Sequence, residues 1–587
     1  MKDLQACLNA YSLPMLRGLA EMQGIKARSE VKAELIDRLT DHLSRSEVIS
    51  MNLSMLTGDE RAALDRVIAA RGKIALHILE REFGKVRQMG AGRLERLKPW
   101  RSPSTPTERL FYLGLLYIGY GAIGDYLGKV FFIPVEILTH LPALEARPAR
   151  FDVQPLPSPP TQIVRADQRP VYDAFVLLSV IQRHWPAAQE GVDGQHALHH
   201  LPQAALTEIQ ARLSVPPDPT SKAAEGTRRA ALLWRLVERI GSAASPDEGR
   251  GKLDPRAARD WLEQPASKRL LALQRAWHED RHWNELWHVP SLDPEETGWR
   301  NDPQLARRHL LRHLAICPAE TWLSLPSFVQ AVKAVDPDFQ RPDGDYESWF
   351  IREAETGRYL RGFEAWDQVE GALIAHIVTG PCRWLGIADV GYAASDEART
   401  RPVAFRITPA GAAFLGLREP VPARSGDELS PFIVHSDLTV DVPADTSWWD
   451  RFHLERLASF REVGDDFSAR YVLTPDDLLR LLEQGVDMEK IVRFLQRAAG
   501  GSVPDPVIRQ LREWGGRYGR VVVGQHLVLQ TASPAVLRQL QQNAEVANCI
   551  AKVVGPQAAL IHAHAHRKVV QALRRAGHVP KIEDVEV

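Results

Sequence analysis

The sequence is poor in cysteine. Its 587 residues include four cysteines, which stand far apart as Cys7, Cys317, Cys382 and Cys549 without a CxxC pair. This spacing provides neither a thiolate zinc site nor the framework of a disulfide-rich secreted protein. The first residues also lack the basic and long apolar stretches of a signal peptide. We therefore expect a protein of the reducing cytoplasm.

Long apolar runs and an excess of one charge are also missing. The most apolar window, residues 110–137, is interrupted by glycines and by Asp125 and Lys129, so it predicts a helix and a hairpin and not a membrane span. The 73 lysines and arginines balance 74 acids, which gives a net charge of −1. A nucleic-acid surface would therefore require local segregation of charge.

Motifs for ATP binding and hydrolysis are missing as well. The nearest match to the phosphate-binding loop GxxxxGK[ST] begins at Gly124, is one residue short, and has Val130 in place of the magnesium-binding hydroxyl. HExxH and GxSxG are lacking, and the pairs Asp465–Asp466 and Asp476–Asp477 are explained by a turn and by helix capping. A nuclease site assembled from distant acids stays open. We expect no enzymatic activity and no cofactor.

Three histidines alternate near the carboxyl end, as His562, His564 and His566. On a strand they would share one face, which suits zinc or copper. No fourth ligand is close in the sequence, and the segment runs into a predicted helix. We therefore favour surface or helix-capping histidines and expect no metal.

Residues 1–48 show helical spacing on both sides of Gly24–Ile25, with Ser29 as the expected N-cap of the second helix. Segment 16–39 resembles a SAP motif, a small helix-turn-helix often found on DNA-binding proteins. A plain helical hairpin docked on its neighbour fits equally well. In the SAP interpretation the DNA-binding residues are Lys26, Arg28 and Lys32.

Residues 58–140 predict three helices followed by a hairpin, with Thr105 capping the third helix ahead of Pro106. This order resembles a winged helix. Segment 71–109 holds ten lysines and arginines against four acids, which indicates phosphate contacts, although each residue alone also fits a solvated helix face. The DNA-binding candidates here are Arg87, Arg93, Arg96, Lys98 and Lys129.

The middle of the chain offers less chemistry. Residues 141–166 are proline-rich and predict a semi-extended linker, and residues 167–290 predict a helical domain without a recognisable site. Residues 303–418 again resemble a winged helix, with Thr408 as a helix cap and residues 395–401 as the tip of the wing.

Residues 431–587 have the most specific pattern. A strand is expected at 432–442, a hairpin at 521–529, and helices at 448–457 and 566–575. Thr474–Pro475 starts a helix, Gly500–Gly501 ends another, and Trp514 leads into the hairpin. This order resembles the N-terminal domain of XPB-type DNA helicases, which also occurs in bacterial helicase-associated proteins. In that family the domain is associated with DNA engagement beside a helicase motor and has no catalytic residues. The resemblance therefore implies a DNA-binding protein whose helicase, ATPase or nuclease partner acts in trans.

Positive charge gathers in the same region. Between residues 506 and 580 ten lysines and arginines face two acids, and a Gly515–Gly516 turn separates aromatic and basic residues. The alternative is that these arginines pair with the acidic half of the domain. The DNA-binding candidates are Arg509, Arg512, Arg517, Tyr518, Arg520, Arg567, Lys568, Arg574 and Arg575.

The sequence thus predicts a mainly α protein with small β-hairpins, an α+β fold of several domains. Its expected function is that of a non-catalytic DNA-binding accessory protein in repair or in defence against foreign DNA. The alternatives are a protein-interaction scaffold and a transcription regulator, both built on winged helices. An apolar helix expected at 110–118 favours the scaffold, because a helix that reads a DNA groove displays polar side chains.

Overall fold

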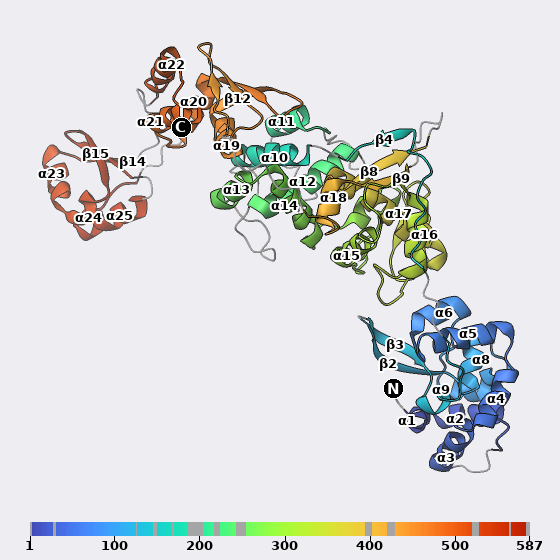
Figure 1. Ribbon diagram of the computed structural model, residues 1–587. Helices are drawn as coiled ribbons and strands as arrows, with labels where there is room; N and C mark the ends of the chain where they lie inside the picture. Colours follow the sequence, from blue (N-terminus) through green and yellow to red (C-terminus); the bar gives the residue numbers. More distant parts are fainter. Residues whose placement is uncertain are drawn as a thin grey trace. The chain divides into compact units, whose positions relative to one another are not determined.

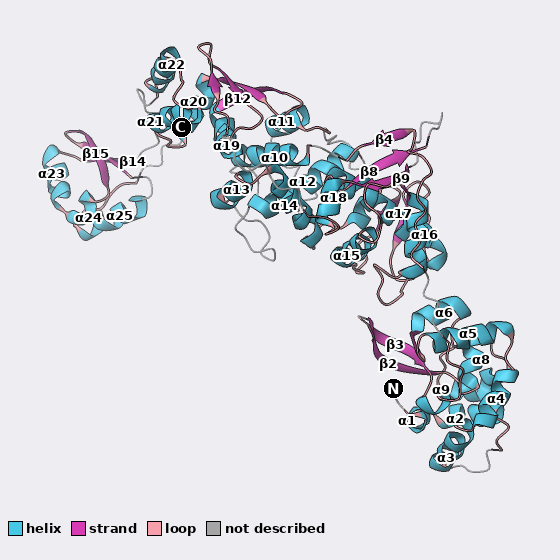
Figure 2. Cartoon of the chain, in the orientation of Figure 1, coloured by secondary structure: helices cyan, strands magenta, loops and turns pink. Residues whose placement is uncertain are grey.

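A computed structural model describes residues 3–26, 31–124, 126–144, 150–166, 169–184, 203–215, 224–241, 254–393, 402–419, 429–518, 527–562 and 565–582. The chain divides into two compact units (Figure 1), Met1–Leu429 with Ser447–Phe452, and Ser430–Thr446 with His453–Val587. Helices dominate and the sheets are small and antiparallel (Figure 2), which confirms the expected α+β class. None of the described helices is long and apolar enough to cross a membrane.

The first 141 residues share one hydrophobic core, to which Leu16, Leu39, Leu64 and Phe131 all contribute. The boundary expected between residues 48 and 58 therefore does not separate two cores, and a helix occupies it. The elements are α1 Leu4–Asn9, α2 Leu13–Met22, α3 Lys32–Leu43, α4 Ser46–Ser54, α5 Gly58–Ala69, β1 Lys73–Ala75, α6 Leu76–Phe83, α7 Ala91–Leu97, α8 Pro106–Tyr112, β2 Tyr117–Ile123, β3 Tyr126–Phe132 and α9 Val135–Leu138.

Local signals place several of these boundaries. Thr105 accepts a hydrogen bond from the Glu108 amide at 3.1 Å, and Pro106 opens α8 as expected. The helix predicted at 110–118 is wrong in extent. It ends at Tyr112, Gly114 takes a φ of 71°, and the chain then enters β2. The β2–β3 hairpin pairs with β1 in the order β1-β3-β2.

The proline-rich segment, predicted as a semi-extended linker, is docked on the following residues over the part described after 149. The Gln154 amide donates to Ser327 Oγ at 3.0 Å, and the Leu156 amide donates to the Trp322 carbonyl at 2.8 Å. Further along, β4 Gln162–Val164 pairs antiparallel with β8 Ala388–Tyr392. Proline has no amide hydrogen to donate to a neighbouring strand, so proline-rich segments occur at the edges of sheets. Strand β4 accordingly forms the outer strand of its sheet.

Helices follow from residue 170. They are α10 Pro170–His184, α11 Gln203–Arg212, α12 Glu225–Gly241, α13 Pro255–Leu262 and α14 Ala266–Glu279. A second group continues through η4 Glu285–His288, β5 Leu292–Pro294, α15 Pro303–Leu314, β6 Leu323–Ser324, α16 Leu325–Val335, β7 Ile351–Glu353, α17 Trp366–Ile377, the π-turn η6 Val378–Cys382, β8, β9 Pro402–Ile407 and α18 Pro409–Phe414. Thr408 caps α18 as expected, while the predicted wing tip 395–401 lies outside the described residues.

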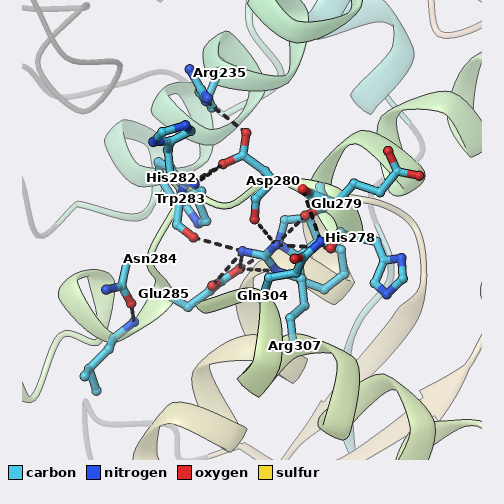
Figure 3. A network of polar contacts seen from close by, with 12 residues as sticks. Arg235, His278, Glu279, Asp280, His282, Trp283, Asn284, Glu285, Gln304 and Arg307 are labelled. Carbon is cyan, nitrogen blue, oxygen red and sulfur yellow. Dashed lines mark hydrogen bonds and ion pairs between the residues drawn. The ribbon is translucent and has the colours of Figure 1, made fainter. Parts of the chain in front are cut away.

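A buried polar network joins these two groups (Figure 3). Arg307 on α15 is fully buried and donates to Glu285 through Nε at 2.9 Å and through Nη2 at 3.0 Å. It also donates to the carbonyl oxygens of Trp277 and Asp280, at 2.6 and 2.7 Å. Asp280 in turn accepts from Arg235 Nε on α12 at 3.0 Å. The helical segment and the segment that follows it are therefore tied together by charge as well as by apolar contact.

The second unit has two separate cores. The first is built on β10 Ile433–Val434, β11 Thr439–Val442, the part of α19 (Trp448–Leu457) from His453 onward, β12 Ala458–Val463, β13 Ala469–Leu473, α20 Pro475–Glu483, α21 Met488–Ala498 and α22 Asp505–Gly515. Its sheet order is β10-β11-β13-β12. The single strand expected at 432–442 is wrong, because Leu438 takes a φ of 72° and the segment turns back on itself as a short hairpin.

The second core comprises β14 Leu527–Gln530, α23 Pro534–Gln542, α24 Ala544–Ala547, β15 Ile550–Gly555, β16 Ala558–Ile561 and α25 His566–Arg575. The final helix matches the expected bounds. The hairpin expected at 521–529 lies largely outside the described residues, and β14 pairs with β16 instead of with a neighbour in sequence.

Candidate nucleic-acid interface

The last helix carries the clearest positive surface. Helix α25 buries Val569, Ala572 and Leu573 against the second core of its unit. Because an α-helix repeats every 3.6 residues, these apolar side chains, spaced three and four residues apart, line one face of α25 and leave the cations on the opposite face. The exposed cations of α25 are Arg567, Lys568, Arg574 and Arg575.

Most of these cations have no acidic partner. Arg575 Nη1 pairs with Glu545 at 2.9 Å, whereas Arg567, Lys568 and Arg574 make no hydrogen bond or ion pair with any residue that the structure describes. Residues 527–582 contain seven lysines and arginines and one acid, so a general shortage of carboxylates leaves these groups open. This part of the predicted interface is available to an anion.

The cations around α22 are mostly neutralised. Arg512 forms a two-pronged pair with Glu489, with both N–O distances at 3.0 Å, and Arg517 Nη2 pairs with Glu513 at 2.6 Å. The hydrogen bond and charge of Glu489 raise the pKa of Arg512 above its ordinary value. The alternative that arginines pair with the acidic half of the domain therefore holds for Arg512, whereas Arg517 pairs with an acid of its own half.

Two further predicted residues of this region stay exposed. Arg509 has no partner among the described residues, and the Tyr518 side chain is 46% exposed. Arg520 lies outside the described residues. Among the described residues of 509–518, Arg512 and Arg517 are thus paired with acids, and Arg509 is the predicted cation without a described partner.

In the first unit, Arg87 is a structural residue. Its Nε donates to both carboxylate oxygens of Glu108, at 2.8 and 3.0 Å, and Glu108 is fully buried. Burial favours the protonated acid, but the hydrogen bonds from Arg87 and Ser104 outweigh it and hold the pKa of Glu108 below its ordinary value. The charge of Arg87 thus compensates a buried carboxylate, and its contact with DNA stays a prediction.

The other predicted cations of this unit that the structure describes are exposed, and only some of them make a side-chain hydrogen bond. Lys32 donates to the Asn9 carbonyl at 2.9 Å, and Arg96 Nε donates to the Gly92 carbonyl at 3.3 Å. Four have no partner among the described residues, namely Lys26, Arg93, Lys98 and Lys129. Arg28 and the expected cap Ser29 lie outside the described residues, and α3 begins at Lys32 after Val31.

The remaining predicted motifs are structural. Thr474 caps α20 by accepting from the Asp477 amide at 3.3 Å, and Asp466 accepts from the Ser468 amide at 3.0 Å within a turn. Strand β16 ends at Ile561, so His562 follows the strand, and His566 opens α25, while His564 lies outside the described residues. No group of three metal-binding side chains occurs among the residues that the structure covers.

Two features were not found by sequence reasoning. The Arg307–Glu285 network left no signal, because its members are separated in sequence and each looks like an ordinary surface residue. The β2–β3 hairpin also exposes Tyr120 and Leu127, at 71% and 63%. Their apolar character was visible in the sequence, but their exposure depends on how far the hairpin projects beyond the core.

Comparison with known proteins supports a relation to helicases. A family model described as the helicase conserved C-terminal domain matches residues 432–554. The DNA 3'-5' helicase XPB of Kineococcus radiotolerans is 29% identical over 153 residues, which are 25% of this chain and 27% of that protein. The chain thus spans about a quarter of the length of that relative. The finer resemblance to an N-terminal XPB domain stays a prediction, since the matching family is described as a C-terminal one. Residues 432–554 form a helicase-related domain.

Proposed function

We propose that this protein is a non-catalytic DNA-binding accessory factor that works with a helicase or nuclease supplied in trans, in DNA repair or in defence against foreign DNA. The observation that carries the proposal is the exposed row of Arg567, Lys568 and Arg574 on α25, which no described carboxylate neutralises. Unpaired cations on one helix face suit the phosphate backbone, whose neutralisation releases counterions. The helicase-related domain of the same unit supports DNA as the polyanion.

The partner in trans is inferred from the motor motifs that the sequence lacks. The segment that most resembles a phosphate-binding loop, Gly124–Val130, lies on the β2–β3 hairpin. A phosphate-binding loop instead connects a strand to the N-terminus of a helix, where backbone amides face the phosphates. This geometry supports a role without an ATP site in this segment.

The element order of the first unit supports the winged-helix interpretation. Apart from α7 in the first series, β7 in the second and the short 3₁₀ and π elements, α5, β1, α6, α8, β2, β3 and α15, β6, α16, α17, β8, β9 share the order helix, strand, helix, helix, strand, strand. In each series the three strands belong to one antiparallel sheet. Such modules are compatible with DNA binding and with protein binding alike.

A salt titration of DNA binding tests the proposal. In the triple variant Arg567→Gln, Lys568→Gln, Arg574→Gln, three phosphate contacts are lost, and the slope of log K against log salt should become shallower by roughly 2–3, at about 0.9 per contact. The matched control is Arg512→Gln, Arg517→Gln, Arg575→Gln, with the same formal charge change. Its slope should change less, because those guanidinium groups already bond to carboxylates. Wild-type protein that binds neither duplex nor single-stranded DNA at low salt would refute the proposal.

A protein-interaction scaffold is the second candidate, and one observation favours it. Helix α8 occupies the position of the helix that would enter a DNA groove, but Thr107, Glu108, Leu110, Phe111 and Tyr112 are all buried. A buried helix cannot read base edges. Stoichiometric co-purification of an ATPase by protein without DNA affinity would select the scaffold.

A further inference from the structure

The β2–β3 hairpin presents an apolar pair at its free end. Tyr120 is 71% exposed and Leu127 is 63% exposed. Tyr120 lies opposite Lys129, and Ala122 lies opposite Leu127. Directly paired residues share a face, so Tyr120 and Leu127 are diagonal neighbours on one face, about 7–8 Å apart and within reach of one flat ligand.

The other face of the hairpin anchors it to the core. Val130 and Phe132 point to that side and are buried. On the face of Tyr120 and Leu127, Phe131 is still buried, whereas Lys129 and Leu127, nearer the tip, are exposed. Large apolar side chains on a projecting hairpin are the kind that enter between or against bases in DNA-bending proteins.

Two side-chain hydrogen bonds brace the strands of the hairpin. Lys73 Nζ donates to the Ala122 carbonyl at 2.8 Å, and Tyr126 Oη donates to the Lys129 carbonyl at 2.9 Å. Seven residue pairs continue the register from Tyr117–Phe132 to Ile123–Tyr126. An element ordered before binding loses little entropy when it meets a ligand.

The positive charge next to Tyr120 and Leu127 indicates the kind of ligand that this pair would bind. The exposed Lys129 ammonium lies directly across the ladder from Tyr120 and has no partner among the described residues. An aromatic ring, an aliphatic side chain and an adjacent cation together match an exposed nucleobase with its neighbouring phosphate.

We propose that the β2–β3 hairpin stacks Tyr120 and Leu127 on the outermost base pair at an open end or junction of a DNA duplex, while Lys129 contacts the adjoining phosphate. This inference rests on the proposed DNA binding and adds to it a preference for interrupted duplexes. An uninterrupted duplex offers no free base face, so the apolar pair gains nothing there.

The experiment compares two DNAs of equal length, a blunt-ended duplex and a dumbbell closed at both ends by loops. Wild-type protein should bind the blunt-ended duplex about tenfold more tightly, because only its terminal bases are free to stack on an aromatic side chain. Tyr120→Ser and Leu127→Ser should each remove most of this preference, whereas Tyr120→Phe should retain it. Ile316→Ser is the matched control, since Ile316 is 61% exposed elsewhere in the same unit.

A fluorescent 2-aminopurine at the terminal position reports stacking directly. Its emission should be quenched by wild-type protein and by Tyr120→Phe, and should recover with Tyr120→Ser. Equal affinity of wild-type protein for both DNAs, or an unchanged end preference in Tyr120→Ser, would overturn the stacking role while leaving salt-dependent DNA binding intact. Self-association that disappears in Tyr120→Ser without any change on DNA would also overturn it. Failure to bind either DNA would refute the proposed function itself.

Discussion

Removal of the Arg307 guanidinium is the sharpest test of how the first unit is held together. In Arg307→Met the aliphatic stem stays, but Glu285 loses both of its guanidinium bonds. Glu285 is 2% exposed, so water cannot replace them without a rearrangement. The carbonyl oxygens of Trp277 and Asp280 lose their donor as well.

The magnitude follows from the burial of the orphaned charge. Breaking a buried ion pair by removing one partner costs about 3–5 kcal/mol, since the remaining charge is left uncompensated. The double variant Arg307→Met with Glu285→Gln should be less destabilised than the single variant, because an amide costs less to bury than a carboxylate. If the double variant is more stable than Arg307→Met alone, the loss in the single variant comes from the uncompensated charge of Glu285 and not from lost packing.

Hydrogen exchange measured by mass spectrometry resolves the effect locally. Amides of α14 and α15 flank Arg307 and should exchange at least about 100-fold faster in the single variant, since about 1.4 kcal/mol is a factor of ten. Peptides from 534–575 belong to the other unit and serve as the internal control. Exchange in α14 and α15 that stays within about threefold of wild type would refute this account of the network.

Three other predictions concern single sites. Burial lowers the pKa of His376 from 6.5 to about 3, so the unfolded state binds a proton that the native state does not, and stability falls as the pH drops from about 6.5 toward 3. Between neutral pH and pH 5.5, His376→Gln should therefore lose about 1.4 kcal/mol less stability than wild type in acid denaturation. Parallel pH profiles of the two proteins would contradict this. In Gly411→Ala the new Cβ would lie 2.1 Å from the Ile387 carbonyl oxygen, so we expect a loss of about 1–3 kcal/mol by thermal melting, and an unchanged midpoint would show that the backbone yields. Thr474→Ala removes the cap of α20 and should cost about 1 kcal/mol, while Thr474→Ser should cost less; equal losses in urea unfolding would exclude capping as the cause.

Local chemistry predicted much of the secondary structure. The caps at Thr105, Thr408 and Thr474 are where the sequence placed them, because a cap depends on residues within four positions of one another. The bounds of α25 were also anticipated, since its apolar stripe of helical period is visible in the sequence. Errors arose where the chain turned unexpectedly, as at Leu438, whose positive φ is unusual for its residue type.

The candidate site could be predicted only in part. Charge counts located the basic regions, but they could not distinguish Arg567, which has no described partner, from Arg512, which bonds to Glu489. They also could not show that Arg87 compensates the buried Glu108. Each distinction depends on a carboxylate brought close by the packing of another element.

The sequence by itself determined the mixture of helices and short strands, most helix starts, the missing phosphate loop and the positive regions, because composition, motifs and short-range hydrogen bonds are written along the chain. The tertiary structure alone decided which cations stay open, that the proline-rich segment lies docked as an edge strand, and that Tyr120 and Leu127 project together into solvent. These outcomes follow from burial and from contacts between residues that are distant in the sequence, and both arise only when the chain folds.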